Sequence, residues 1–141
     1  MLLSVMDVEE ARQFLRKNHN VVMCTLRQSG EPTMSPITAG VDDEGYAVIS
    51  SRETAYKVKH LRRDPRVWLC CLTKQFYGEW LLITGRATIV SLPDAMDGLM
   101  DYYRRISGEH PDWDDYKRAM ERDQRVLIRV AIERVGPQQQ G

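Results

Sequence analysis

Six short runs of apolar and β-branched residues, each closed by a turn sequence, restrict what this chain can fold into more than any other feature. Runs of this kind, bounded by Gly, Pro, Asn, Asp or Ser, are typical of β-strands joined by tight turns. They lie at Val21 to Arg27, Thr33 to Val41, Tyr46 to Ser51, Val67 to Lys74, Trp80 to Ser91 and Val126 to Glu133. We therefore expect a mainly β, α+β fold, a small six-stranded antiparallel β-barrel with peripheral helices.

Helix signals lie before and between these runs. A capping box predicts a first helix over Val8 to Lys17. Pro93 suits the first position of a later helix that ends at Gly108, and Asp112 can cap the helix that follows. These helices would cover the outside of the barrel.

Two residues inside the predicted strands limit how those strands pair. Pro36 has no N–H to donate to a ladder, so its strand must lie at an edge, carry a bulge or stay open to a ligand. Gly85 favours a bulge or a sharp bend, which closure of a small barrel often requires.

Length and composition indicate one globular domain over residues 1–141, of which 136–141 should form a flexible tail. Lys plus Arg and Asp plus Glu number 20 each, so the net charge gives no reason to expect nucleic acid as a partner. No apolar run approaches the roughly 18 residues of a membrane-spanning helix. Three cysteines, two of them adjacent and directed to opposite faces of a strand, give no disulfide framework, which suits a reducing cytoplasm.

The segment from Ile49 to Arg66 joins a strand end to a short cationic helix. Ser50 and Ser51 close the strand, and Lys57 follows in a helical segment rich in Lys and Arg. Hydroxyls, free N–H groups at a helix start and an ammonium can converge on one phosphate. The alternative is an amphipathic helix whose basic face is simply solvated.

Motifs for resident catalysis or metal binding are missing from the sequence. It contains no phosphate-binding glycine loop, no nucleophile elbow and no Cys-x-x-Cys pair. The histidines have no metal-ligand spacing and fit surface or loop positions, with His60 a possible exception because it shares the helix of Lys57. A phosphate site without an acid, base or nucleophile favours a cofactor that brings its own reactivity.

The order of several short motifs resembles split-barrel flavin and deazaflavin oxidoreductases related to pyridoxamine 5'-phosphate oxidase. The motifs are Ser35-Pro36-Ile37, Ile49-Ser50-Ser51, Ala55-Tyr56-Lys57, Leu61 to Arg66 and Gly85-Arg86-Ala87. A later block, Tyr103 to His110 with Asp112 to Tyr116 and Asp123 to Leu127, is similar to the actinobacterial and mycobacterial subgroup that binds the deazaflavin coenzyme F420. The resemblance extends from about Val21 to Val135.

This resemblance implies a homodimer of split β-barrels, of the FMN-binding type, with two cofactor sites at the dimer interface. By position, the cofactor phosphate would be held by Ser50, Ser51, Ala55, Tyr56 and Lys57. The ring would lie along the backbone of Met34, Ser35, Pro36, Ile37 and Thr38. Basic residues further along the helix could meet a polyanionic tail or remain solvated: Lys59, His60, Arg62 and Arg63.

Two aromatic residues, Tyr77 and Trp80, would reach the ring or the substrate from the partner subunit. Their alternative role is packing in the barrel core or at the dimer interface. The tail from Glu133 to Pro137 lacks the C-terminal Trp and Arg pair of true pyridoxamine phosphate oxidases, which argues against oxidation of vitamin B6.

The activity implied is hydride transfer from reduced F420 to an electron-poor double bond in a flat hydrophobic acceptor, such as a quinone, a coumarin-like lactone or a tetrapyrrole. The protein would orient the two rings and exclude water. Two alternatives remain open at this point: an FMN-dependent oxidase or reductase on the same fold, and a protein that binds F420 or FMN without turnover.

Overall fold

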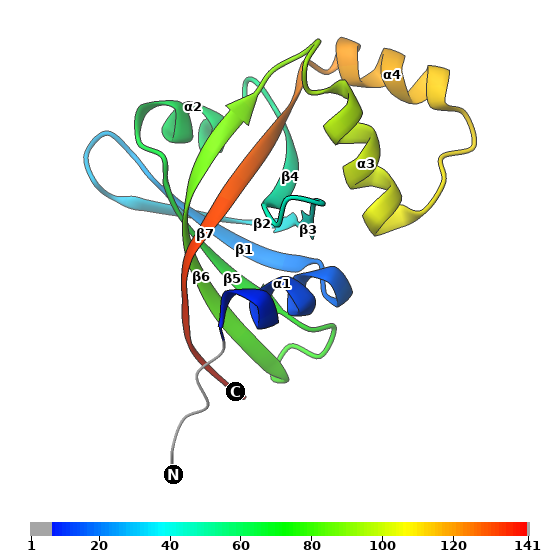
Figure 1. Cartoon of the computed structure of the whole chain (residues 1–141). Helices are drawn as coiled ribbons and strands as arrows, with labels where there is room; N and C mark the ends of the chain where they lie inside the picture. The colour runs from blue at the N-terminus through cyan, green and yellow to red at the C-terminus, as the bar shows by residue number, and fades with distance from the viewer. Residues whose placement is uncertain (1–6, 141) are drawn as a thin grey trace.

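The computed structural model describes residues 7–140. In this range it contains four helices: α1 (Val8–Lys17), α2 (Tyr56–Arg63), α3 (Met96–Ser107) and α4 (Trp113–Arg122). The strands are β1 (Asn20–Leu26), β2 (Pro32–Thr38), β3 (Gly40–Val41), β4 (Ala47–Arg52), β5 (Arg66–Leu72), β6 (Glu79–Val90) and β7 (Arg125–Gln140). Figure 1 shows the strands curling into a half-barrel, with α3 and α4 set to one side.

All strands belong to one antiparallel sheet in the order β2-β1-β5-β6-β7-β4-β3. The two edge strands, β2 and β3, are consecutive in the chain and are separated only by Ala39. The backbone N–H of Ala39 donates to the carbonyl oxygen of His19 at 3.0 Å instead of continuing a ladder. The sheet must therefore curl until its edges meet, and the single strand predicted over Thr33 to Val41 is divided into two.

Several strand features predicted from sequence are confirmed. Strand β2 lies at a sheet edge, as Pro36 requires. The β6–β7 register shifts between Thr84 and Gly85, and a Cβ atom at Gly85 would lie 2.4 Å from the carbonyl oxygen of Ala131. Only glycine fits this close approach of two strands.

Two boundaries differ from the prediction. Pro93 lies in a turn after a cis peptide bond, and α3 begins only at Met96, because backbone hydrogen bonds from Ala95 to Ser91 and from Met96 to Pro93 close that turn first. Residues 136–140, expected as a flexible tail, continue β7 and pair with the start of β6, where Glu79 lies opposite Gln140.

Most of the hydrophobic core fills the concave side of the sheet. Alternate residues of the strands point into it, as Val21, Met23, Leu69 and Cys71 do. Helix α1 contributes a buried apolar stripe, and α2 contributes Val58 and Leu61. A second, smaller cluster lies outside the barrel, between α3, α4 and the outer face of β4 and β7.

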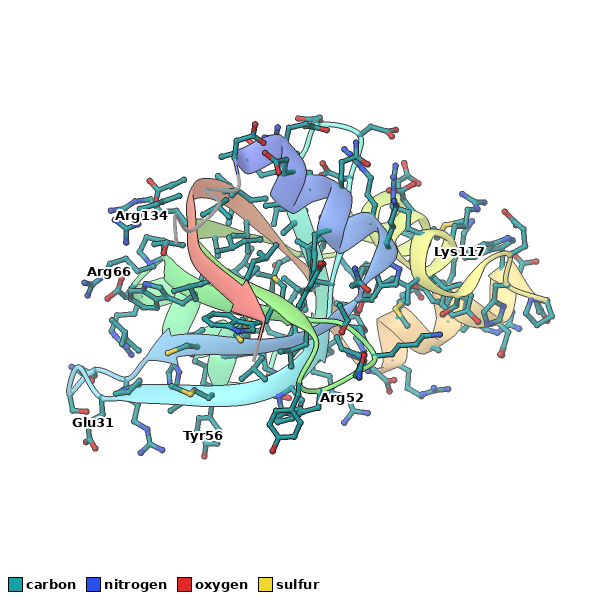
Figure 2. All side chains as sticks on the ribbon, turned by 90° about the horizontal axis from the view of Figure 1, so that it is seen from below. Glu31, Arg52, Tyr56, Arg66, Lys117 and Arg134 are labelled. Atoms are coloured by element: carbon teal, nitrogen blue, oxygen red, sulfur yellow. The ribbon has the colours of Figure 1, made fainter. Side chains whose placement is uncertain are left out.

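The two adjacent cysteines agree with the predicted alternation, because Cys71 is buried in the core while Cys70 lies on the opposite face of β5. No helix among residues 7–140 is both long and apolar enough to cross a membrane. Charged side chains project all around the molecule, with Arg66 and Arg134 near one end and Lys117 of α4 near the other (Figure 2).

Candidate functional site: a pocket between β2 and α2

Helix α2 is held in place by its apolar residues and by its C-terminal end. Val58 and Leu61 are buried in the core, which turns the residues between them towards the open edge of the sheet. At its C-terminus the N–H of Asp64 donates to the carbonyl oxygen of His60, and Pro65 prevents the helix from continuing. The helix therefore presents its first turn to β2.

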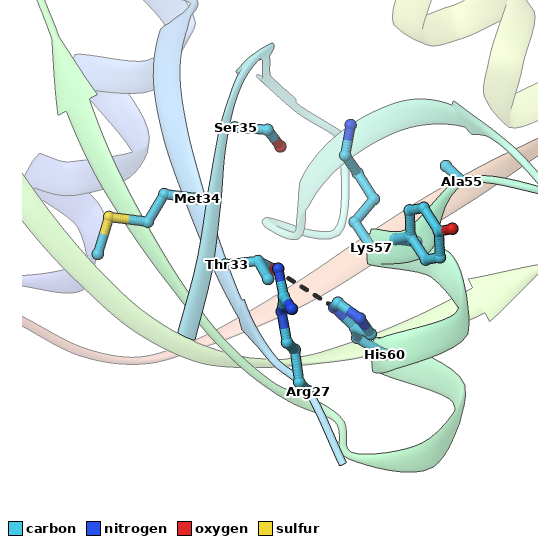
Figure 3. Close-up of a pocket in the computed structure, with 8 residues that line it drawn as sticks. Arg27, Thr33, Met34, Ser35, Ala55, Lys57 and His60 are labelled. Carbon is cyan, nitrogen blue, oxygen red and sulfur yellow. Dashed lines mark hydrogen bonds between the residues drawn. The ribbon is translucent and has the colours of Figure 1, made fainter. Parts of the chain in front are cut away.

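A pocket of about 860 Å³ lies between this helix and the β1–β2 hairpin. Its walls come from the end of β1, from β2 and from the first turns of α2. Figure 3 shows Ser35, Lys57 and His60 on one side of β2, whereas the side chain of Met34 points to the other side. The lining residues are Arg27, Thr33, Met34, Ser35, Ala55, Tyr56, Lys57 and His60.

The first turn of α2 lacks the usual protein partners of a helix start. The N-cap is Ala55, whose side chain cannot accept a hydrogen bond, and the turn carries no acidic residue. Ser, Thr, Asp or Asn at this position would stabilise the helix by about 1 kcal/mol relative to Ala. N–H groups and the positive end of the helix dipole therefore remain available to an anion beside the pocket.

Lys57 places an ammonium group at the same end of the pocket. The side chain is half-buried, and burial, followed by the nearby charge of Arg125, lowers its pKa. Within the described chain, no acidic side chain forms an ion pair with it. A cation that is desolvated and not neutralised by the protein favours an anionic ligand.

His60 lies at the other end of the pocket and is only 8% exposed. Its Nδ1 is 3.0 Å from the hydroxyl of Thr25 and 3.3 Å from the hydroxyl of Thr33. Burial, and then the charges of Arg63 and Arg27, lowers the pKa of His60, so the imidazole is neutral at physiological pH.

Comparison with known proteins identifies the family. Residues 8–139 match the family described as pyridoxamine 5'-phosphate oxidase. The chain belongs to this family. The family resemblance and the split-barrel fold predicted from the sequence are thus confirmed.

Solved structures share the same family fold at low identity. A conserved hypothetical protein from Mycobacterium tuberculosis is 22% identical with a TM-score of 0.76, over 96% of this chain and 86% of that one. A structure described as an F420 reductase is 18% identical with a TM-score of 0.69, over 89% and 94%. An FAD-binding protein from Mesorhizobium loti is 18% identical with a TM-score of 0.66, over 96% of both chains.

The pocket brings together about half of the residues predicted for the family's cofactor site. They are Met34, Ser35, Ala55, Tyr56, Lys57 and His60. Pro36, Ile37 and Thr38 continue along β2 without lining the pocket, and Ser50 and Ser51 lie on β4, where Ser51 is buried. Tyr56 projects outward from the molecular surface and is 77% exposed (Figure 2).

The aromatic pair assigned to the partner's site lies elsewhere on the subunit. Tyr77 belongs to the turn between β5 and β6 and is 74% exposed, in edge-to-face contact with Phe76. Trp80 is the second residue of β6, lies opposite Leu72 and is partly exposed. Neither residue lines the pocket of its own chain.

Arg27 and Thr33 line the pocket, although neither residue was predicted from the sequence. Arg27 follows the last residue of β1, and Thr33 lies on β2 opposite Thr25. Two hydroxyl side chains opposite each other in a hairpin can be predicted to form a polar pair once the hairpin register is known. The register, however, depends on the length of the turn, which the sequence does not fix.

The remaining basic residues of α2 are occupied by contacts within the protein. Arg62 pairs with Glu53 at 2.7 Å, Arg63 donates to the carbonyl oxygen of Leu26, and Lys59 lies 5.4 Å from the ring centre of Tyr56. Among the described residues, no cluster of His, Cys, Asp and Glu has the arrangement of a metal site.

Proposed function

We propose that the protein is an F420-dependent reductase that transfers hydride from the reduced deazaflavin to an electron-poor double bond of a flat hydrophobic acceptor. The acceptor class would include quinones, coumarin-like lactones and tetrapyrroles. The observation that carries this proposal is the uncapped start of α2 beside the half-buried Lys57, at the mouth of a pocket whose other wall is an edge strand. The family match and the neighbour described as an F420 reductase support it.

The pocket residues fit a cofactor with a phosphate and a flat ring. Lys57 and the free N–H groups of α2 would bind the phosphate, and the hydroxyls of Ser50 and Ser51 on β4 would add donors to it. The edge strand from Met34 to Thr38 would lie along the ring through its backbone. When bound, F420 would supply a transferable hydride, while the chain would orient the acceptor and exclude water.

The test begins with cofactor binding to the purified protein. F420 should bind in the micromolar range or tighter, and FMN should bind more weakly. Lys57→Ala should weaken F420 binding by about 1.5 to 3 kcal/mol, the range for a hydrogen bond to a charged group. The matched control is Lys59→Ala, because Lys59 is exposed on the same helix and does not line the pocket.

Calorimetric titration and cofactor fluorescence measure these affinities. Equal affinities for Lys57→Ala and the parent would remove Lys57 from the phosphate site. Stoichiometric yellow FMN in the purified protein would instead favour the FMN-dependent alternative. Binding of F420 without oxidation of its reduced form by any quinone or coumarin would identify a cofactor-binding protein.

A homodimer is part of this proposal. The outer face of β2, β1, β5 and β6 carries an apolar stripe in which Pro36, Val22, Cys70 and Leu82 lie directly opposite one another across four strands. Among the described residues no helix covers this face, and Met34 beside it is 69% exposed. A symmetric copy of the chain would bury such a surface.

In the dimer, Tyr77 and Trp80 would complete the partner's pocket. A mixed dimer of Lys57→Ala and Trp80→Ala subunits tests this arrangement. If each site takes Lys57 from one chain and Trp80 from the other, one site carries both changes and the other carries neither, so about half of the sites remain fully active. If each chain builds its own site, no unimpaired site remains.

A further inference from the structure

Thr25, Thr33 and His60 form a closed triangle of hydrogen bonds at one end of the pocket. The two hydroxyl oxygens are 3.1 Å apart, and both lie within 3.3 Å of His60 Nδ1. Thr25 is only 1% exposed, so its hydroxyl cannot rely on water for a partner. The proton of the Thr25 hydroxyl must therefore be accommodated within the triangle or by the adjacent backbone.

Counting the protons assigns the tautomer of His60. If Thr33 donates to Thr25 and Thr25 donates to Nδ1, both hydroxyl protons have acceptors within 3.1 Å. If Nδ1 carried the proton and donated to Thr25, the Thr25 hydroxyl would have to donate to Thr33, and the Thr33 proton would be left with the carbonyl oxygen of Thr25 at 3.5 Å, a weak bond, or would turn into the pocket. The first arrangement is better satisfied, and it places the imidazole proton on Nε2.

The Nε2–H group of His60 is on the side of the ring away from the threonines, where a ligand in the pocket could accept its hydrogen bond. The ring turns Nδ1 towards the threonines, and what remains exposed of His60 lines the pocket. Arg27 lies beside His60 and Thr33, whereas the amine of Lys57 extends towards Ser35 (Figure 3). The pocket therefore has two separate ends that favour electronegative atoms, one at Lys57 and one at His60 with Arg27.

We propose that His60 is a catalytic residue whose Nε2–H donates to the carbonyl oxygen of the acceptor, with Arg27 adding positive charge beside it. This inference rests on the proposed function and assigns the acceptor a conjugated carbonyl group. Lys57 would then serve the phosphate at the opposite end. The threonines are positioning residues, because they fix the tautomer of His60 without touching the acceptor.

The chemistry explains why a neutral donor is useful there. Hydride addition to a conjugated carbonyl compound forms a C–H bond at the β-carbon and breaks the C=C π bond. The π electrons move onto the carbonyl oxygen as an enolate. In an enone or lactone a proton from water then adds at the α-carbon, whereas in a quinone the ring carbon that received the hydride loses a proton and both oxygens are protonated, which gives the hydroquinone. The reductant is the reduced cofactor of the proposed function, which loses two electrons. A fixed N–H group stabilises the oxygen as its charge develops, and a neutral imidazole can do so without surrendering a proton.

Two artificial acceptors separate this role from a structural one. Menadione is reduced at a conjugated carbonyl system, whereas phenazine methosulfate accepts hydride without any carbonyl group. With reduced F420 as donor, His60→Leu should lower kcat for menadione about 10- to 100-fold and leave phenazine methosulfate within about twofold. His60→Gln, which retains a neutral N–H donor, should recover most of the menadione activity.

Cofactor affinity, measured by fluorescence, should remain within about threefold in these variants. Should His60→Leu fail to fold, Arg27→Gln provides a second variant, because Arg27 is exposed. It should slow menadione reduction by about three- to tenfold and spare phenazine methosulfate. Thermal unfolding of each variant verifies the fold.

Two measurements do not depend on turnover. Nitrogen NMR at neutral pH should show His60 with Nδ1 unprotonated and Nε2 protonated. The carbonyl infrared band of menadione bound to the protein should lie at lower frequency than in His60→Leu, because the N–H group polarises the carbonyl. A protonated Nδ1, or an unshifted carbonyl band, would overturn the inference.

The outcomes also distinguish the inference from the function on which it rests. If the parent protein oxidises reduced F420 with neither acceptor, the proposed function fails, and the role of His60 fails with it. If the parent turns over and His60→Leu slows both acceptors equally, slows neither, or weakens only cofactor binding, the proposed function stands and the role of His60 is wrong.

Discussion

The outer face of the sheet has two halves, and helices cover only one of them. On β4 and β7, the apolar residues Val48 and Leu127 are buried beneath α3 and α4 with Leu99 and Tyr116. On β2, β1, β5 and β6, an apolar stripe remains uncovered by any described helix. We call the face of β4 and β7 the covered half and the face of β2, β1, β5 and β6 the bare half. Helices bury the first half, and the second half is the surface that a second copy would bury in the proposed homodimer.

The covered half also shows how close the internal packing is. A Cβ atom at Gly98 of α3 would lie 2.6 Å from the side chain of Leu127, so the helix rests directly on the sheet there. The hydroxyl of Tyr116 donates to the carbonyl oxygen of Leu99 at 2.8 Å and fastens α4 to α3. In the bare half, the hydroxyl of Tyr102 in α3 donates to the carbonyl oxygen of Thr38 at 2.9 Å, at the end of β2. The stripe itself consists of aliphatic and thiol-bearing side chains, as at Val22, Cys70 and Leu82.

The largest effect is expected from a charge placed on the bare half. Leu82→Arg should dissociate the proposed dimer, weakening it by roughly a thousandfold or more, because the guanidinium would be buried without a partner. Sedimentation velocity measures the change in mass. Gln28→Arg, which adds the same charge to the exposed β1–β2 turn, should leave the mass unchanged. If the parent protein sediments as a monomer, the proposed homodimer is wrong.

Truncation in the covered half should reduce stability without affecting assembly. Leu99 is fully buried, so Leu99→Ala should lower the free energy of unfolding by about 3 kcal/mol, within the usual range for such cavities. Urea denaturation followed by fluorescence measures this loss. Lys117→Ala on the exposed face of α4 should change stability by less than about 0.5 kcal/mol. Dissociation of the Leu99→Ala protein would show that the two halves are not independent.

Removal of one hydroxyl should have a smaller effect. Tyr116→Phe should lower the free energy of unfolding by about 1 kcal/mol at neutral pH, because the Leu99 carbonyl loses its donor. Burial raises the pKa of Tyr116 to about 12 from 10.0, so the parent should lose stability as pH rises above 10.0. Denaturation at several alkaline pH values should show this loss in the parent and a weaker one in Tyr116→Phe.

The smallest effect concerns the stability of the protein at acid pH, which depends on His60. Burial lowers the pKa of His60 below 6.5, so the unfolded chain binds a proton more readily than the folded one. The contribution of His60 to stability is complete above pH 6.5 and is lost as the pH falls towards the lowered pKa that His60 has in the folded protein. His60→Gln should remove this part of the pH dependence, as denaturation curves between mildly acidic and neutral pH would reveal. An unchanged acid slope would mean that His60 is solvated.

Periodicity was sufficient to predict the elements that pack against the core. Helix α1 has the predicted bounds, and strand bounds are displaced by only a residue or two apart from the break at Ala39 and the C-terminal end of β7, because buried residues repeat at fixed spacing in both kinds of element. The break at Ala39 could not be predicted, since it depends on a hydrogen bond to His19, twenty positions earlier in the chain. The extension of β7 depends in the same way on pairing with β6.

For the pocket, the sequence predicted a short helix that carries Lys57 after a strand end, because these features are adjacent in the chain, and the structure places Lys57 in the pocket lining. Its contact with a phosphate stays a prediction. It missed Arg27 and Thr33 because they reach the pocket only through the folding of the β1–β2 hairpin. The burial of His60 was also hidden, because a histidine among basic residues is indistinguishable from a solvated one until Thr25 is seen opposite it.

The position of β7 has a consequence for how quickly the molecule reaches its native state. This strand joins β4 and β3 to the rest of the sheet, and it pairs Ala47 with Val130 and Arg52 with Arg125. These partners are more than 70 positions apart, so a long loop must close before their contacts form. Folding rates fall as such distant pairings dominate a structure. We therefore expect the attachment of β4 to β7 to be a late event, with β1, β2, β5 and β6 already assembled when it occurs.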